Sequence, residues 1–151
     1  MTSMKSPESR LQQITAHAER TYPEECCGVM LGREAVEERV VQEVIEIDNS
    51  QDANRRRRFL VSPAQYRDAE RQAAERHMAL LGFYHSHPDH PAAPSAFDTE
   101  HALPWFSYLI VSVAHGSADR ATVWMLDEDR ARFAEQALEV QARTERFSNV
   151  R

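Results

Sequence analysis

Long apolar runs, an apolar leader and internal repeats are all missing from this sequence of 151 residues. No apolar stretch approaches the roughly 20 residues that a transmembrane helix requires. The first ten residues, Met1 to Arg10, are polar and contain no apolar signal core. We therefore expect a cytoplasmic protein that has no membrane partner.

Cysteine and lysine are both scarce. The two cysteines, Cys26 and Cys27, are adjacent, and Lys5 is the only lysine. Neighbouring cysteines cannot join distant segments, and a disulfide between them would be strained, so a disulfide framework is excluded and two buried thiols are expected. The formal net charge is −6. This charge argues against a nucleic-acid partner, because phosphate binding depends on positive charge.

The periodicity of the remaining sequence predicts a single α+β domain over residues 8–145, between disordered ends at 1–7 and 146–151. We expect a mixed, largely antiparallel sheet with helices on both faces. Helices are predicted at 7–20, with Ser6 as its N-cap, at 63–77 after the N-cap Ser62, and at 95–103. The segment 133–140 fits either an edge strand or a helix. Other strands are predicted at 24–32, 40–47, 59–61, 80–85, 105–113 and 121–126.

Two histidines, His85 and His87, stand one residue apart at the end of the apolar segment 80–85. Side chains alternate between the two faces of a strand, so these imidazoles should point the same way. Asp98 follows after a proline-rich loop that is long enough to return a carboxylate toward them. Two imidazoles, a carboxylate and an open position form the ligand set of a catalytic zinc ion.

Other zinc patterns do not fit. The His-Glu-x-x-His pattern of zincins and the Pro-Cys-x-x-Cys pattern of deaminases are absent. An amidohydrolase barrel needs about 250 residues, more than this chain of 151 residues can supply.

Ser95 and Asp98 also fit a capping box, with Ser95 as the N-cap of a helix and Asp98 at its third position. The capping and metal-binding roles are compatible, because a capped helix start would hold both side chains in place.

The segments His85-Ser-His87-Pro and Pro-Ser95-Ala-Phe-Asp98 resemble the JAMM motif of MPN-domain metallopeptidases. In that motif His-x-His is followed by seven residues, a serine, two residues and an aspartate. The family also has a glutamate after its first helix, and Glu25 matches it better than Glu24 does. The resemblance covers about residues 8–140 and is to the short, stand-alone prokaryotic type.

This resemblance implies an MPN-like domain that binds one Zn²⁺ per chain and hydrolyses peptide or isopeptide bonds. His85, His87 and Asp98 would hold the zinc. Glu25 would accept a proton from water and pass it to the leaving amine, and Ser95 would donate a hydrogen bond to the oxyanion. Family members cleave after the Gly-Gly tail of ubiquitin-like proteins, including sulfur carriers in prokaryotes. The identity of the carrier, the kind of bond and the oligomeric state stay open.

Two non-enzymatic functions fit parts of the same pattern. One is an MPN scaffold that binds partners without catalysis, and the other is a small metal-binding or metal-sensing protein that uses His85, His87 and His90. The full set of ligands, together with Ser95 and Glu25, favours the enzyme.

Several residues outside the motif have simpler explanations. The arginine run 55–58 could attract an acidic carrier, but a solvated loop end fits it better. Asp89 and His90 are expected to be loop residues near the mouth of the cleft. The remaining residues are given structural roles: Trp105, Phe106 and Trp124 in the core, and the histidines His17, His77 and His115.

Overall fold

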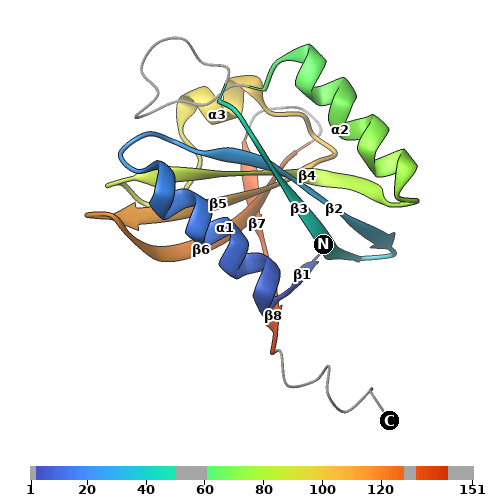
Figure 1. The fold of residues 1–151 in the computed structure, drawn as a ribbon, viewed down its shortest axis with the longest axis horizontal. Coiled ribbons are helices and arrows are strands. Elements are labelled where there is room, and N and C mark those ends of the chain that lie inside the picture. Colours follow the sequence, from blue (N-terminus) through green and yellow to red (C-terminus); the bar gives the residue numbers. More distant parts are fainter. Residues whose placement is uncertain (1–2, 50–60, 128–131, 143–151) are drawn as a thin grey trace.

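A computed structural model describes residues 3–49, 61–127 and 132–142 of the chain (Figure 1). Within these ranges the chain forms eight strands and three helices. In chain order they are β1 (Ser3–Pro7), α1 (Glu8–Thr21), β2 (Cys27–Ala35), β3 (Glu38–Ile47), α2 (Pro63–Glu75), β4 (Ala79–Pro88), α3 (Ala96–His101), β5 (Ser107–Ala114), β6 (Ser117–Leu126), β7 (Phe133–Gln136) and β8 (Leu138–Gln141). The arginine run 55–58, residues 59 and 60 of a predicted strand and the tail 146–151 lie outside the described residues.

All eight strands belong to one sheet, in the order β7-β6-β5-β4-β2-β3-β1-β8. Four of its seven pairings are antiparallel, and the pairings β1–β3, β1–β8 and β4–β5 are parallel. Helix α1 lies over one face of the sheet, and α2 and α3 lie over the other (Figure 1). The predicted α+β fold, with a mixed sheet between helices, is confirmed. None of the described helices is long and apolar enough to cross a membrane.

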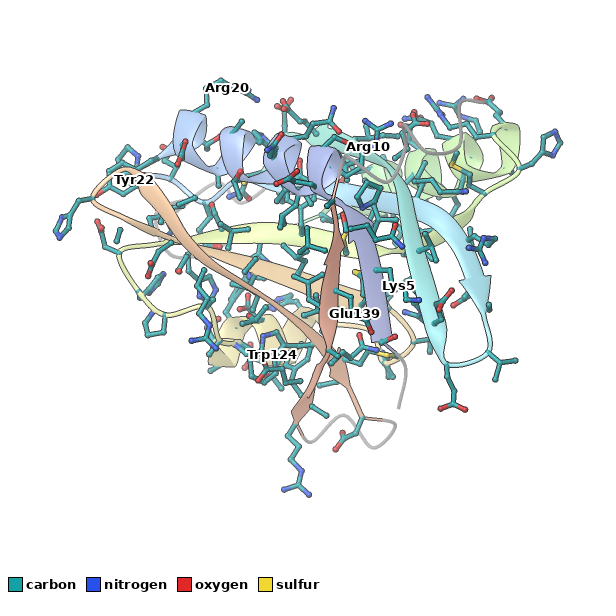
Figure 2. All side chains as sticks on the ribbon, turned by 90° about the horizontal axis from the view of Figure 1, so that it is seen from below. Lys5, Arg10, Arg20, Tyr22, Trp124 and Glu139 are labelled. Carbon is teal, nitrogen blue, oxygen red and sulfur yellow. The ribbon has the colours of Figure 1, made fainter. Side chains whose placement is uncertain are left out.

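The two edges of the sheet are joined by one extended segment, because only Ala137 separates β7 from β8. β7 pairs with β6 at one edge, and β8 pairs with β1 at the other. The register sets Lys5 on β1 opposite Glu139 on β8 (Figure 2). The sheet therefore curls toward a barrel, although β7 and β8 are its two edge strands and do not pair with each other. The segment 133–140, for which strand and helix were both open, is extended.

The alternation of side chains along the strands builds one hydrophobic cluster on each face of the sheet. On β5, Leu109 and Val111 face α1, whereas Tyr108 faces α2. Buried residues of α1, such as Ile14, join the first cluster, and Ala69 of α2 joins the second. The central strands β4 and β5 are thus buried on both faces, which makes them a rigid support for side chains at their ends.

The structure corrects the prediction for the N-terminus. Residues 3–7, expected to be disordered, form β1 between β3 and β8. Met4 is completely buried in the core, and the burial of its apolar side chain stabilises the strand although the neighbouring residues are polar. The predicted cap of the first helix is also wrong, since Pro7 occupies the N-cap position and the Ser6 hydroxyl donates to the Pro7 carbonyl. Ser62 caps α2 as predicted.

The aromatic residues expected in the core divide into three groups. Phe106 is buried, Trp124 is half-buried, and Trp105 is 60% exposed. Trp105 lies in the turn before β5 begins at Ser107, so the burial of that strand does not extend to it. His17 is buried and lies 2.8 Å from the Tyr84 hydroxyl, which confirms its structural role.

Candidate metal centre

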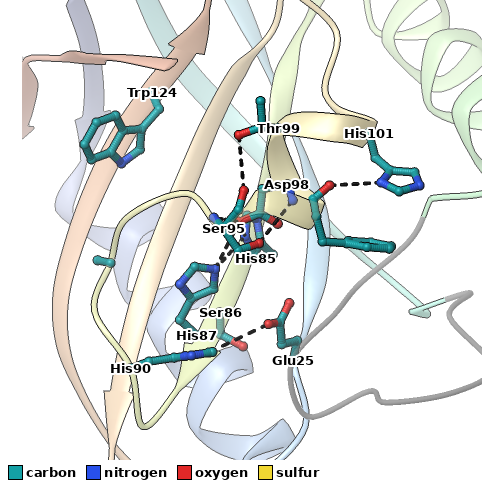
Figure 3. A network of polar contacts seen from close by, with 12 residues as sticks. Glu25, His85, Ser86, His87, His90, Ser95, Asp98, Thr99, His101 and Trp124 are labelled. Carbon is teal, nitrogen blue, oxygen red and sulfur yellow. Dashed lines mark hydrogen bonds and ion pairs between the residues drawn. The ribbon is translucent and has the colours of Figure 1, made fainter. Parts of the chain in front are cut away.

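His85 and His87 lie at the carboxyl end of β4, which runs between β2 and β5. Both side chains are buried, and their Nε2 atoms are 3.2 Å apart. The two-residue period of a strand therefore brings them to one point, as the sequence predicts. The imidazoles converge where β4 leaves the sheet and the chain turns toward α3 (Figure 3).

Asp98 reaches the same point from the first turn of α3. The Ser95 hydroxyl accepts a hydrogen bond from the Asp98 amide at 3.1 Å, and Asp98 Oδ2 accepts one from the Ser95 amide at 2.9 Å. These two bonds form the predicted capping box, which fixes the start of the helix. The same Oδ2 atom lies 3.2 Å from Nε2 of His85 and 3.2 Å from Nε2 of His87. One carboxylate thus caps the helix and faces both imidazoles.

The three side-chain atoms fit a tetrahedral metal ion. They form a triangle whose sides are all 3.2 Å. A regular tetrahedron with metal–ligand distances of about 2.0–2.1 Å has edges of about 3.3–3.4 Å, so little movement is needed. All three residues are buried and belong to the one group of potential ligands found among the described residues. The site can therefore bind a metal ion and leave its fourth position open.

The protonation states of these residues also suit metal binding. The Pro91 carbonyl lies 2.8 Å from Nδ1 of His87 and can only accept, so Nδ1 carries a proton and Nε2 is the ring nitrogen left to bind a metal. Burial lowers the pKa of His85 and favours its neutral ring. Burial alone would raise the pKa of Asp98, but the facing histidines and the Ser95 amide hold it below its usual range. Neutral imidazoles and a charged carboxylate are the forms that bind metals.

Glu25 lies beside this triangle because of the pairing between β2 and β4. Cys27 stands opposite His85 in the register, and the Cys26 amide donates a hydrogen bond to the Ser86 hydroxyl at 2.9 Å. These contacts bring Glu25, far upstream in the sequence, next to the two histidines (Figure 3). Its side chain is 1% exposed.

The Glu25 carboxyl is buried and has a raised pKa. Neither of its oxygens has a hydrogen-bond partner among the residues that the structure describes. Burial, with repulsion from Asp98, raises its pKa to about 9. Leaving a buried carboxyl without such partners costs folding free energy, and groups with pKa values shifted in this way are concentrated at functional sites.

A largely apolar cavity of about 200 Å³ opens beside the triangle. His85 and Asp98 line it at the metal end. Elsewhere its walls are mostly aromatic or aliphatic, including Phe83, Phe97, Ala102, Leu103, Tyr108 and Ile110. The cavity is large enough for an apolar side chain, so a substrate could place such a group next to the metal site.

Sequence reasoning missed the contacts that connect the loop after β4 to its surroundings. Asp89, expected to be only a loop residue, accepts a hydrogen bond from the Tyr22 hydroxyl at 2.5 Å and another from the His115 amide at 2.8 Å. Its positive φ of 58° is typical of a turn, and aspartate tolerates it well. No local sequence pattern predicts these two contacts, because both partners lie far from Asp89 in the sequence.

The fold and the buried triangle together define an α+β domain with a His-His-Asp group that could hold a metal ion. Residues 7–127 match the family of prokaryotic homologs of the JAB domain. Because the match covers most of the chain, the protein belongs to that family, and the predicted JAMM/MPN resemblance is confirmed.

Two curated proteins share part of this sequence. The chain is 31% identical over 99 residues to the tail tip assembly protein K of Escherichia phage N15, and this match covers 63% of the chain and 36% of the phage protein. It is 32% identical over 104 residues to a probable TtuB-protein conjugate cleaving protease of Thermus thermophilus, covering 69% of the chain and 66% of that protein. The chain thus spans about a third of one relative and just under two thirds of the other.

Solved structures share the fold over nearly the whole chain. A Desulfitobacterium hafniense protein superposes with a TM-score of 0.81 at 26% identity, covering 92% of this chain and 93% of its own. A Salinibacter ruber protein gives 0.71 at 38% identity, covering 91% and 92%. A JAB1/MPN domain protein from Archaeoglobus fulgidus gives 0.59 at 20% identity, covering 93% and 100%, which supports the fold alone.

Proposed function

We propose that this protein is a zinc metallopeptidase that hydrolyses the peptide or isopeptide bond after the Gly-Gly tail of a ubiquitin-like or sulfur-carrier protein. The observation that carries the proposal is the 3.2 Å triangle of His85, His87 and Asp98 with the buried carboxyl of Glu25 beside it. The Thermus relative described as a probable TtuB-protein conjugate cleaving protease supports the substrate class.

The types of ligand support zinc as the metal. Two imidazoles and one carboxylate with tetrahedral spacing are typical of catalytic zinc sites. When bound, zinc supplies Lewis-acid activation of water and of the scissile carbonyl. The residues His85, His87 and Asp98 would hold it, and the hydrogen bond from His87 to the Pro91 carbonyl would keep that ring correctly oriented.

Glu25 is the proposed general base and acid. As a carboxylate, Glu25 can accept a proton from water and deliver it to the leaving amine. In the metal-free protein burial raises its pKa to about 9 and favours the protonated form, whereas a cation held by the adjacent residues would favour the carboxylate that the proton transfer needs. The absence of hydrogen-bond partners for its oxygens among the described residues leaves both of them available for this transfer.

Ser95 is the proposed oxyanion donor. Its hydroxyl oxygen accepts from the Asp98 amide, and that bond does not use the hydroxyl hydrogen. The hydrogen can therefore point toward the carbonyl oxygen of a substrate as negative charge develops there. The capping box holds the Ser95 backbone in place before the substrate arrives, which lowers the cost of reorganisation.

Replacing Glu25 gives the direct test. A carrier domain followed by Gly-Gly and a reporter would be incubated with the zinc-loaded protein, and cleavage products would be identified by mass spectrometry. The variant Glu25→Gln keeps the size of the side chain and removes its proton-transfer chemistry, so we expect a loss of about 100- to 10,000-fold in kcat. The matched control is Glu24→Gln, because Glu24 is the exposed neighbour.

The outcomes separate the proposed enzyme from its rivals. Full zinc-dependent cleavage by the Glu25→Gln variant would refute the assigned mechanism. Stoichiometric zinc binding without cleavage across a panel of carriers, linear peptides and isopeptides would instead favour a metal-binding or scaffold role.

A further inference from the structure

We propose that His90 is a positioning residue for Glu25, an inference that rests on the proposed hydrolytic function. His90 lies in the loop between β4 and α3, at a position for which the JAMM motif specifies no residue type. Its Nε2 atom is 4.0 Å from Glu25 Oε2, and its ring centroid is 4.7 Å from that of His87 (Figure 3). The imidazole therefore lies between a candidate metal ligand and the candidate general base.

The backbone on one side of His90 is anchored by Asp89. The Asp89 amide donates to the Val113 carbonyl at 2.7 Å, and its carboxylate accepts from the Tyr22 hydroxyl and the His115 amide. Tyr22 lies three residues before Glu25. The same contact thus connects the loop that carries His90 to the segment that carries Glu25.

The backbone on the other side of His90 is anchored by Pro91, whose carbonyl accepts the hydrogen bond from His87 Nδ1. The backbone at His90 is consequently held on both sides by residues with fixed partners. This placement differs from that of an ordinary exposed loop histidine, since the side chain is only 31% exposed.

A direct role for His90 as a metal ligand fits the structure less well. The potential ligand atoms within 4.8 Å of one another belong to His85, His87 and Asp98, and His90 is not in that group. Its Nε2 atom faces the Glu25 carboxyl instead.

The distance of 4.0 Å is longer than a hydrogen bond, but a movement of about 1 Å would close it. Catalytic hydrogen bonds are often long before substrate binds and shorten in the complex. A neutral imidazole already has one N–H donor, so the role needs no charge on His90. We infer that His90 restricts the Glu25 carboxyl to the orientation that faces the metal site.

Paired substitutions at His90 test this role. His90→Leu removes the hydrogen-bonding atoms, and His90→Gln keeps a donor at a similar distance. We expect His90→Leu to lower kcat by about 10- to 100-fold with little change in KM or zinc content, and His90→Gln to recover most of the loss. Wild-type kinetics for His90→Leu, or loss of zinc from that variant, would overturn the proposal.

A double-mutant cycle tests whether His90 acts through Glu25. In a Glu25→Gln background, His90→Leu should cause little further loss of kcat, because the group that it positions is already inactive. An equal fold-loss in both backgrounds would show that His90 acts independently of Glu25 and would refute the positioning role.

A second cycle needs no substrate and keeps this inference separate from the proposed function. Denaturant midpoints of the metal-free protein would be compared for His90→Leu, Glu25→Met and the double variant. Contact between the two side chains predicts a non-additive shift, whereas additive shifts would contradict it. If the wild-type protein cleaves nothing, the proposed function fails, and this cycle still decides whether His90 and Glu25 are coupled.

Discussion

The amide of Cys26 donates a hydrogen bond to the hydroxyl of Ser86, which lies between His85 and His87 on β4. This bond joins the strand after Glu25 to the strand that carries the two candidate metal ligands. It is a bond between two buried groups, 60 residues apart in sequence. The distance between the candidate base and the metal site therefore depends on the register of β2 against β4.

Removing the Ser86 hydroxyl should lower both the stability of the fold and the rate of catalysis. Ser86→Ala leaves the buried Cys26 amide without this acceptor, which should lower the free energy of unfolding by about 1–3 kcal/mol. Because Glu25 is the neighbouring residue, we also expect kcat to fall by about 10-fold. Chemical denaturation and carrier-cleavage kinetics would measure the two effects.

The control for this variant is Ser112→Ala. The Ser112 hydroxyl likewise accepts a hydrogen bond from a backbone amide, that of Arg120, but it does so on β5 and β6. A similar loss of stability with normal kcat is expected there. Equal losses of kcat in both variants would indicate a general weakening of the sheet.

The parts of the site that were predictable from sequence depend on short-range geometry. His85 and His87 share a face because of strand alternation, and Ser95 and Asp98 face each other because a helix start places them one turn apart. These relationships are fixed by the backbone within a few residues. The assignment of Glu25 depended instead on the family resemblance, since the residue alone would pass for a solvated acid.

The features that were missed depend on pairings between distant segments. Residues 3–7 are mostly polar and become ordered only because β3 and β8 provide partners on both sides. The contact between Tyr22 and Asp89 has the same origin. Trp105 was wrongly expected in the core for a related reason. The apolar sequence indicates that a strand is near, but it does not indicate at which residue that strand begins to pair within the sheet.

Asp98→Asn should weaken metal binding more than it weakens the fold. The asparagine oxygen can still accept from the Ser95 amide, so the helix cap is largely kept, but the negative charge that faces the two histidines is lost. We expect zinc affinity to fall by roughly 10- to 100-fold or more, as metal-site substitutions commonly do. Competition with a chromophoric chelator would measure it, and the exposed Asp119→Asn would be the control.

The stability of the metal-free protein should depend on pH through Glu25. Its pKa is raised from 4.5 to about 9 in the folded state, so its protonated form favours folding. The associated stability is present below pH 4.5 and is lost as the pH rises toward 9. Replacing Glu25 with glutamine removes this titration. The variant should therefore gain stability relative to wild type by about 1 kcal/mol per pH unit across that window.

Denaturation of the metal-free wild type, Glu25→Gln and Glu24→Gln at pH 5, 7 and 8.5 would test this dependence. The exposed Glu24→Gln variant should follow the wild type at all three values. A constant difference between Glu25→Gln and wild type would show that the carboxyl of Glu25 does not titrate in this range.

Filling the cavity beside the metal site should change which substrates are accepted. Ala102 is buried and lines the cavity of about 200 Å³, so Ala102→Leu would occupy much of the space next to Phe97 and Leu103. If the cavity receives an apolar side chain close to the scissile bond, fusions with leucine or phenylalanine there should show a KM raised by about 10-fold or more, which corresponds to the 1–3 kcal/mol available from a well-filled apolar pocket. Fusions with glycine or alanine at the same position should keep their KM, because they leave the cavity empty. Zinc content and thermal stability would confirm that the variant still folds around its metal. A uniform rise in KM for every fusion would mean that the cavity does not select the substrate side chain.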